Sequence, residues 1–173
     1  MANALMDSYR PVTIASGVRT SAERAPGKIA LRESVRELSY AGLVERIDRV
    51  ANGAVHGLGL ARGDNVMLLA PNCLEYVEIV AGFAEAGIAV ATINPRQTAR
   101  EIAAIADDCA ARVVIAHPAV EELVQDADLA APERMLILGD AYEDWLARAK
   151  PEAPQSATDE RDAFAISYTS GTT

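Results

Sequence analysis

The amino-acid sequence predicts an α/β fold, a mainly parallel sheet with helices on both faces. Apolar runs of four to six residues occur at positions 66–70, 88–93 and 113–116, interrupted by a polar residue only at Thr92. Segments whose apolar residues recur with a helical period separate these runs. Strands that are apolar along their whole length are typical of a parallel sheet whose two faces are both covered by helices.

The residues before the first of these runs predict a helix followed by two short strands. Apolar residues are spaced for an amphipathic helix over positions 13–24, and a Pro-Gly pair ends it. Positions 28–33 and 36–39 have the character of short strands, and the chain turns between them near Ser34.

A longer helix is expected after Ser39, because serine is a favourable N-cap residue. Gly57 and Gly59 end this helix. Together with Gly63 they do not form a dinucleotide-binding fingerprint, because the spacing is wrong and the fingerprint must follow a strand. We favour a helix cap followed by a turn. The apolar face of the helix consists of Leu43, Ile47, Val50, Ala54 and Leu58.

Two further helices begin and end at recognisable residues. Positions 73–86 are expected to be helical, with Gly87 in the C′ position that ends many helices. Thr98 and Glu101 have the spacing of a capping box, so a second helix begins there and runs to about Cys109. These helices alternate with the apolar runs, as a parallel sheet requires.

The alternation continues beyond the third apolar run. A helix is predicted over positions 118–129, a strand over 135–138 and a short helix over 142–149. We expect Tyr142 and Trp145 to anchor the short helix to the core. No internal repeat and no low-complexity tract is present.

Composition excludes some classes of function. The net charge of −9 argues against a nucleic-acid partner, since a phosphate backbone requires a basic face. Two cysteines, Cys73 and Cys109, do not suggest a disulfide framework, which favours a reducing compartment. The N-terminus lacks the pattern of a signal peptide, and no apolar run has membrane-spanning length. We therefore expect a cytoplasmic protein with no transmembrane segment.

Several isolated residues could carry chemistry, but each has a simpler interpretation. Cys73 lies near a helix N-terminus, where its pKa could fall, yet a half-buried neutral thiol is the interpretation that we favour. His56 and His117 lack ligand spacing, so surface or capping roles are favoured over metal binding. The acidic pairs Asp107-Asp108 and Glu121-Glu122 are expected to be solvated.

The last residues of the chain are the strongest functional signal. An apolar run at positions 163–168 predicts a buried strand, and Thr169-Ser170-Gly171-Thr172-Thr173 follows it directly. Glycine lets the backbone approach an anion, and hydroxyl and N–H groups donate to phosphate oxygens. Such residues are also common in ordinary loops. Position favours a binding loop, because ligands of open α/β sheets lie beyond the carboxyl ends of the strands.

The sequence resembles the adenylate-forming enzymes, which include acyl-CoA synthetases, luciferases and the adenylation domains of peptide synthetases. Residues 168–173 resemble the opening of that family's phosphate-binding motif, although the Gly-x-Pro-Lys-Gly that continues it is absent here. Gly42 stands where the family usually has Glu. The other matching stretches, in the family's order, are Leu38-Ser39-Tyr40-Ala41-Gly42-Leu43, Gly57-Leu58-Gly59-Leu60, Gly63-Asp64-Asn65-Val66, Pro71-Asn72-Cys73-Leu74-Glu75-Tyr76, Ala86-Gly87-Ile88-Ala89-Val90 and Asn94-Pro95-Arg96-Gln97-Thr98.

The resemblance implies a two-step reaction that uses ATP, Mg²⁺ and coenzyme A. A carboxylate attacks the α-phosphate of ATP to give an acyl-adenylate and pyrophosphate, and a thiol then takes the acyl group. Asn94 favours an acyl-CoA synthetase, because peptide-synthetase domains tend to carry Asp there. By the same resemblance, the β- and γ-phosphates would be bound by Thr169, Ser170, Gly171, Thr172 and Thr173.

The resemblance also implies a domain organisation. Residues 1–173 correspond to the N-terminal part of the family's large domain. Within it we expect a tail at 1–11, an α/β core at 12–149, a linker at 150–161 and, at 162–173, a strand with the start of the phosphate loop.

The whole protein is expected to be an ATP-dependent carboxylate–CoA ligase, with the 173-residue chain inactive alone and prone to form homo-oligomers. A non-catalytic binding module and a degenerate remnant of the same fold are the alternatives.

Overall fold

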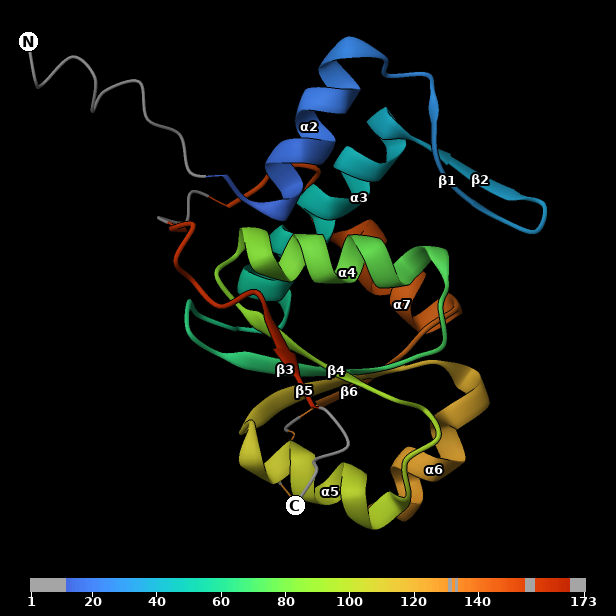
Figure 1. Ribbon diagram of the computed structural model, residues 1–173, viewed down its shortest axis with the longest axis vertical. Helices are drawn as coiled ribbons and strands as arrows, with labels where there is room; N and C mark the ends of the chain where they lie inside the picture. Colours follow the sequence, from blue (N-terminus) through green and yellow to red (C-terminus); the bar gives the residue numbers. More distant parts are fainter. Residues whose placement is uncertain (1–11, 131, 133, 155–157, 169–173) are drawn as a thin grey trace, which may run out of the picture.

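The computed structural model describes residues 12–130, 132, 134–154 and 158–168 (Figure 1). Helices lie above and below a central sheet, which makes a three-layer α/β arrangement. The upper layer holds α2 (Ile14–Arg24), α3 (Tyr40–Asn52), α4 (Leu74–Glu85) and α7 (Asp140–Arg148), and the lower layer holds α5 (Ala99–Asp108) and α6 (Glu121–Asp126).

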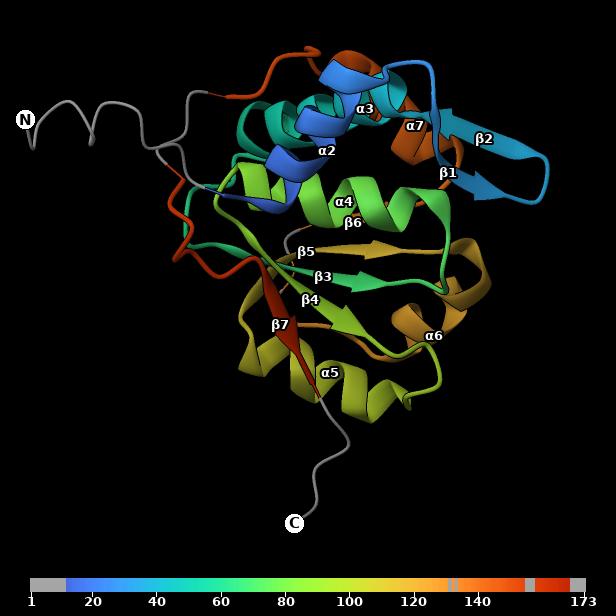
Figure 2. The same cartoon turned by 45° about the horizontal axis from the view of Figure 1, so that its top comes forward.

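The central sheet is parallel throughout its described strands, which confirms the predicted fold class (Figure 2). Its strand order is β6-β5-β3-β4-β7. Val66 and Leu68 of β3 belong to the core above the sheet, whereas Met67 and Leu69 belong to the core below it. The strands are β3 (Asn65–Leu69), β4 (Ala89–Ile93), β5 (Ala111–Ala116), β6 (Arg134–Ile137) and β7 (Ala165–Ser167).

Chain direction explains which helix covers which face. The crossover from β3 to β4 moves toward one edge of the sheet, and the next two crossovers move toward the other edge. Crossovers between parallel strands are right-handed, so a reversal of direction must change the face on which the connecting helix lies. This rule places α4 on one face and α5 and α6 on the other. The return from β6 to β7 brings α7 back to the face of α4.

The N-terminal elements form as the sequence predicts. Thr13 caps α2 through a capping box with Ser16, and Ser39 caps α3 by accepting a hydrogen bond from the Gly42 N–H at 3.2 Å. A π-helical turn, Gly53–Gly57, extends α3 before the chain leaves it. Strands β1 (Ile29–Glu33) and β2 (Arg36–Ser39) form a separate antiparallel hairpin, with Ser34 in the left-handed region at its turn.

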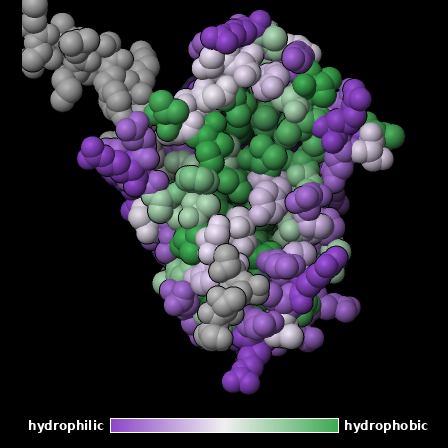
Figure 3. All heavy atoms as spheres, in the orientation of Figure 1, coloured by the Kyte–Doolittle hydropathy of each residue, from purple (hydrophilic) through white to green (hydrophobic). Residues whose placement is uncertain are grey.

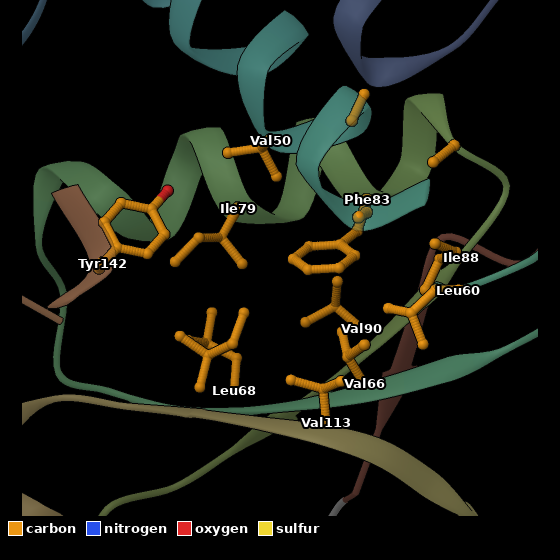
Figure 4. Close-up of a cluster of buried hydrophobic side chains, with 14 of the residues drawn as sticks. Val50, Leu60, Val66, Leu68, Ile79, Phe83, Ile88, Val90, Val113 and Tyr142 are labelled. Atoms are coloured by element: carbon orange, nitrogen blue, oxygen red, sulfur yellow. The ribbon is translucent and has the colours of Figure 1, made fainter. Parts of the chain in front are cut away.

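The main core lies between the sheet and helices α3, α4 and α7 (Figure 4). Phe83 and Ile79 of α4 point down toward Val66 and Leu68 of β3. Tyr142 of α7 is fully buried in this cluster, and Trp145 packs against the cluster with its ring centroid 5.6 Å from that of Tyr142. The predicted anchoring of α7 by these two aromatic residues is therefore confirmed.

Apolar residues are unevenly distributed over the molecular surface seen in the orientation of Figure 1. Figure 3 shows apolar residues gathered over α4, whereas hydrophilic residues predominate toward α5. Helix α4 is apolar over most of its circumference, because it packs on the sheet below and on α2 and α3 above. Its three buried or half-buried carboxylates, Glu75, Glu78 and Glu85, pair with arginines of β2, α3 and α2 respectively.

Two predicted elements differ from the structure. The helix expected over positions 118–129 is a short 3₁₀ turn, Pro118–Val120, followed by α6, which ends at Asp126. Asp128 adopts a left-handed φ of 45° just beyond it, a conformation that Asp tolerates and that ends a helix. The expected buried strand at 163–168 is instead the short edge strand β7, with Phe164 49% exposed just before it, because among the described strands only β4 pairs with it.

Candidate phosphate-binding edge of the sheet

Parallel strands end on a common edge, and the turns that follow them form the candidate site. The strand order reverses between β3 and β5, the position at which open α/β sheets bind ligands. The two strand exits meet there, because the His117 N–H donates a hydrogen bond to the Leu69 carbonyl oxygen at 2.9 Å.

The turn after β4 is fixed by its own polar residues. The side-chain oxygen of Asn94 accepts a hydrogen bond from the Arg96 N–H at 3.0 Å, and its carbonyl oxygen accepts one from the Gln97 N–H at 3.1 Å. The Thr98 hydroxyl and the Glu101 carboxylate then form the predicted capping box at the start of α5. This turn therefore has a defined course from the strand into the helix.

The last described strand delivers the chain to the same edge. Ala165 pairs with Val90, and Ser167 pairs with Thr92, in parallel register. The predicted phosphate-binding residues, Thr169, Ser170, Gly171, Thr172 and Thr173, lie outside the described residues. What the structure establishes is the strand from which they leave and its neighbour, β4.

Tyr168 links the end of β7 to α5. Its hydroxyl donates a hydrogen bond to the Asp108 Oδ2 at 2.7 Å, and its ring packs against the apolar cluster beneath the sheet. Burial, reinforced by the hydrogen bond to Asp108, raises the pKa of the Tyr168 hydroxyl and keeps it a donor. Asp108 is exposed, as predicted, yet it accepts this hydrogen bond from a residue 60 positions away, and no local sequence pattern predicts such a contact.

Cys73 is a neutral thiol. Burial is the largest cause that raises the pKa of Cys73, to about 11, and the nearby carboxylates of Glu75 and Glu33 also raise it. The favoured half-buried position is confirmed, and burial together with these carboxylates opposes the nucleophilic thiolate at the N-terminus of α4. Burial also raises the pKa of Cys109.

His117 has the predicted capping role. Its Nδ1 accepts a hydrogen bond from the Ala119 N–H at 3.1 Å, at the start of the 3₁₀ turn. His56 lies in the last turn of the π-helical segment, far along the chain from His117. Among the described residues, none of the helices has the length and apolar character that crossing a bilayer requires.

An open parallel sheet with helices on both faces and polar turns along its carboxyl edge defines a class of ligand-binding α/β proteins. Residues 18–173 match the family model described as AMP-binding enzyme, which covers most of the chain. The chain belongs to the AMP-binding enzyme family.

Two of the curated relatives with similar sequences are named as ligases. The chain is 31% identical over 153 residues to a fatty acid–[acyl-carrier-protein] ligase, ScoC of Streptomyces coeruleorubidus, covering 88% of this chain and 29% of that protein. It is 31% identical over 140 residues to a long-chain-fatty-acid–CoA ligase, FadD13 of Mycobacterium tuberculosis, covering 79% of this chain and 28% of that protein. The chain thus spans less than a third of the length of these relatives.

Solved structures agree in fold. The N-terminal domain of FACL13 from Mycobacterium tuberculosis, solved with an inhibitor, superimposes with a TM-score of 0.85 at 28% identity, over 92% of this chain and 42% of that chain. The anthranilate CoA ligase AuaEII, solved with anthranoyl-AMP, superimposes with a TM-score of 0.86 at 25% identity, over 97% of this chain and 34% of that chain.

Proposed function

We propose that this chain is the N-terminal part of an ATP-dependent carboxylate–CoA ligase and that it supplies the first half of the phosphate loop. The observation that carries the proposal is the parallel register of β7 beside β4, which brings the end of β7 to the carboxyl edge of the sheet, directly before residues 169–173 in the sequence. Family membership supports it, since the similar proteins include CoA and acyl-carrier-protein ligases.

In the proposed reaction, a carboxylate oxygen bonds to the α-phosphorus of ATP while the bond to the leaving pyrophosphate breaks. The sulfur of coenzyme A then attacks the acyl carbon and AMP departs. Thr169, Ser170, Gly171, Thr172 and Thr173 would donate hydrogen bonds to the β- and γ-phosphates, whose negative charge grows as pyrophosphate leaves. Bound Mg²⁺ would neutralise part of that charge.

Neutral donors suit this chain. With a net charge of −9, it has no general attraction for polyphosphate, so binding would depend on hydroxyl and N–H groups placed close to the phosphate oxygens. The turn after β4 begins with Asn94 rather than Asp, which favours coenzyme A as the thiol. An acyl-carrier protein is the second candidate, because the similar ScoC is a ligase of that kind.

The experiment has two parts. The reading frame beyond codon 173 is sequenced first, and an in-frame Gly-x-Pro-Lys-Gly supports the ligase. An immediate stop supports the binding module or the remnant, which calorimetric titration of the chain with ATP then separates, because only a working module binds ATP.

Carboxylate-dependent pyrophosphate release is then measured with the complete gene product and with the 173-residue chain. We expect turnover from the first and none from the second, because the chain holds less than a third of the length of its ligase relatives. A complete protein that releases no pyrophosphate with a panel of aliphatic and aromatic acids contradicts the proposal. We further propose a cytoplasmic location, which fractionation of cells tests.

A further inference from the structure

The side chain of Tyr168 makes polar and apolar contacts with one helix. The hydroxyl donates to Asp108 in the last turn of α5 at 2.7 Å, and the ring packs on the cluster that includes Ile105 and Cys109 of the same helix end. Tyr168 directly precedes the five residues proposed to bind phosphate. The contact therefore anchors the residue from which that segment continues.

Strands β4 and β7 and helix α5 are connected to one another in a ring that this contact completes. Strand β4 pairs with β7, and β4 also leads through the turn at 94–98 into α5. The far end of α5 then holds Tyr168 through Asp108. Figure 2 shows the result, with β7 descending from the sheet toward α5.

Backbone pairing alone holds β7 weakly. The strand has three residues, and in the described part of the chain it pairs only with β4. Short edge strands have few ladder hydrogen bonds and open readily. A side-chain anchor at the end of such a strand has a large effect on the direction in which the chain continues.

We propose that Tyr168 is a positioning residue for phosphate binding, and that its hydroxyl, held by Asp108, sets the course of the following segment. This inference rests on the proposed function. Tyr168 does not touch the phosphates in this proposal. It fixes the backbone from which their donors project, and phosphoryl chemistry loses rate when such donors move by about 1 Å.

The kinetic test uses the complete ligase. Tyr168→Phe keeps the ring and removes the hydroxyl, so we expect the KM for ATP to rise about 3- to 10-fold and kcat to fall, with the KM for the carboxylic acid unchanged. Asp108→Ala should match it, and the double variant should be no worse than either single variant. Asp108→Asn should stay near wild type, because its amide oxygen still accepts the hydrogen bond.

Asp107→Ala is the matched control. This exposed carboxylate is adjacent to Asp108 on α5, and within the described residues its side chain makes no hydrogen bond to Tyr168. We expect wild-type kinetics from it. If Tyr168→Phe fails to fold, the Asp108 variants still test the positioning role of the hydrogen bond, because Asp108 is exposed and its replacement leaves the core unchanged.

A second measurement does not depend on activity. Amide hydrogen exchange of the peptide at 163–168 in the 173-residue chain should accelerate in Tyr168→Phe and Asp108→Ala, and stay unchanged in Asp108→Asn and Asp107→Ala. Unchanged exchange, or additive effects in the double variant, overturns the positioning role. So does a wild-type KM for ATP in Tyr168→Phe, which leaves the proposed function intact. A wild-type enzyme without ATP-dependent turnover overturns both.

Discussion

The Tyr142 hydroxyl donates a hydrogen bond to the Glu78 carboxylate at 2.8 Å, and both side chains are 0–1% exposed. Arg46 donates to the same carboxylate from its Nε at 2.5 Å and from its Nη2 at 2.7 Å. One buried carboxylate thus joins helices α3, α4 and α7. Because water cannot replace a lost partner there, this contact should be sensitive to small changes.

Tyr142→Phe should lower the free energy of unfolding by about 1–3 kcal/mol, because Glu78 loses a buried donor while the ring volume stays the same. Chemical unfolding in urea measures it. The control is Tyr40→Phe: Tyr40 is half-buried, its hydroxyl has no hydrogen bond among the described residues, and its loss should change stability by less than about 0.5 kcal/mol. Equal losses in the two variants would contradict the role of the contact.

The pH dependence of the free energy of unfolding should reveal the titration of Glu78. Burial raises the pKa of Glu78 above its ordinary value of 4.5, and the hydrogen bonds from Arg46 only partly oppose this. The native state therefore holds this proton more tightly than the unfolded state does. The stability that results is fully present below pH 4.5 and is lost as the pH rises through the raised native pKa.

Glu78→Gln removes this titration. We therefore expect the free energy of unfolding of the wild type, minus that of the variant, to decrease as the pH rises from about 4 to 7. Urea unfolding of both proteins at each pH gives the difference directly, and other titrating groups cancel in it. A difference that stays level or increases over this range would show that pairing, not burial, dominates the pKa of Glu78.

Gly82→Ala should destabilise the protein. An added Cβ would lie 2.5 Å from the Cβ and the Cγ1 of Val50 and 2.9 Å from the Ile47 carbonyl oxygen, so α3 and α4 would have to separate. Overpacking of this kind costs about 1–3 kcal/mol, which exceeds the gain of about 1 kcal/mol in helix propensity.

Gly17→Ala in α2 isolates the propensity effect. Nothing lies within 4 Å of a Cβ at Gly17, so this variant should gain about 0.5–1 kcal/mol. Thermal unfolding of the two variants should therefore shift in opposite directions. A stabilising Gly82→Ala would mean that the two helices can move apart at little cost.

Thr98→Ala should cost about 1 kcal/mol by removing the N-cap of α5. The Thr98 hydroxyl accepts from the Glu101 N–H at 3.4 Å, and the backbone N–H of Thr98 donates to the Glu101 carboxylate at 2.8 Å. Thr20→Ala is the control, because Thr20 lies inside α2 and, within the described part of the chain, its hydroxyl bonds to the Ser16 carbonyl oxygen alone. Urea unfolding should show a loss for Thr98→Ala alone.

Self-association is expected for the 173-residue chain. Val12, Ile14 and Phe164 are exposed large apolar residues that line one hollow of about 130 Å³, and apolar residues gather over α4 (Figure 3). Sedimentation velocity at rising concentration should show species heavier than a monomer, and Phe164→Ser should reduce them. A strict monomer at high concentration contradicts this expectation.

Periodicity and capping residues predicted most of the fold, because these signals act within a few residues of the chain. The parallel sheet, the capping box of α5 and the stop of α4 at Gly87, whose φ is 72°, all follow from such local patterns. The helix after His117 is shorter than predicted, because the left-handed turn at Asp128 gives no periodic signal. The half-exposed character of β7 was also missed, since an apolar run does not reveal how many strands will pair with it.

Residue pattern by itself determined the fold class, the order of the elements, the caps and the family, all of which depend on neighbours in the chain. Tertiary structure alone decided that Glu75, Glu78 and Glu85 of α4 pair with Arg36, Arg46 and Arg19, and that Asp108 holds Tyr168. The partners lie 32 to 66 residues apart along the chain. A charged side chain has the same appearance in a sequence whether it faces water or a partner, and only the packing of helices against the sheet brings these groups within hydrogen-bond distance.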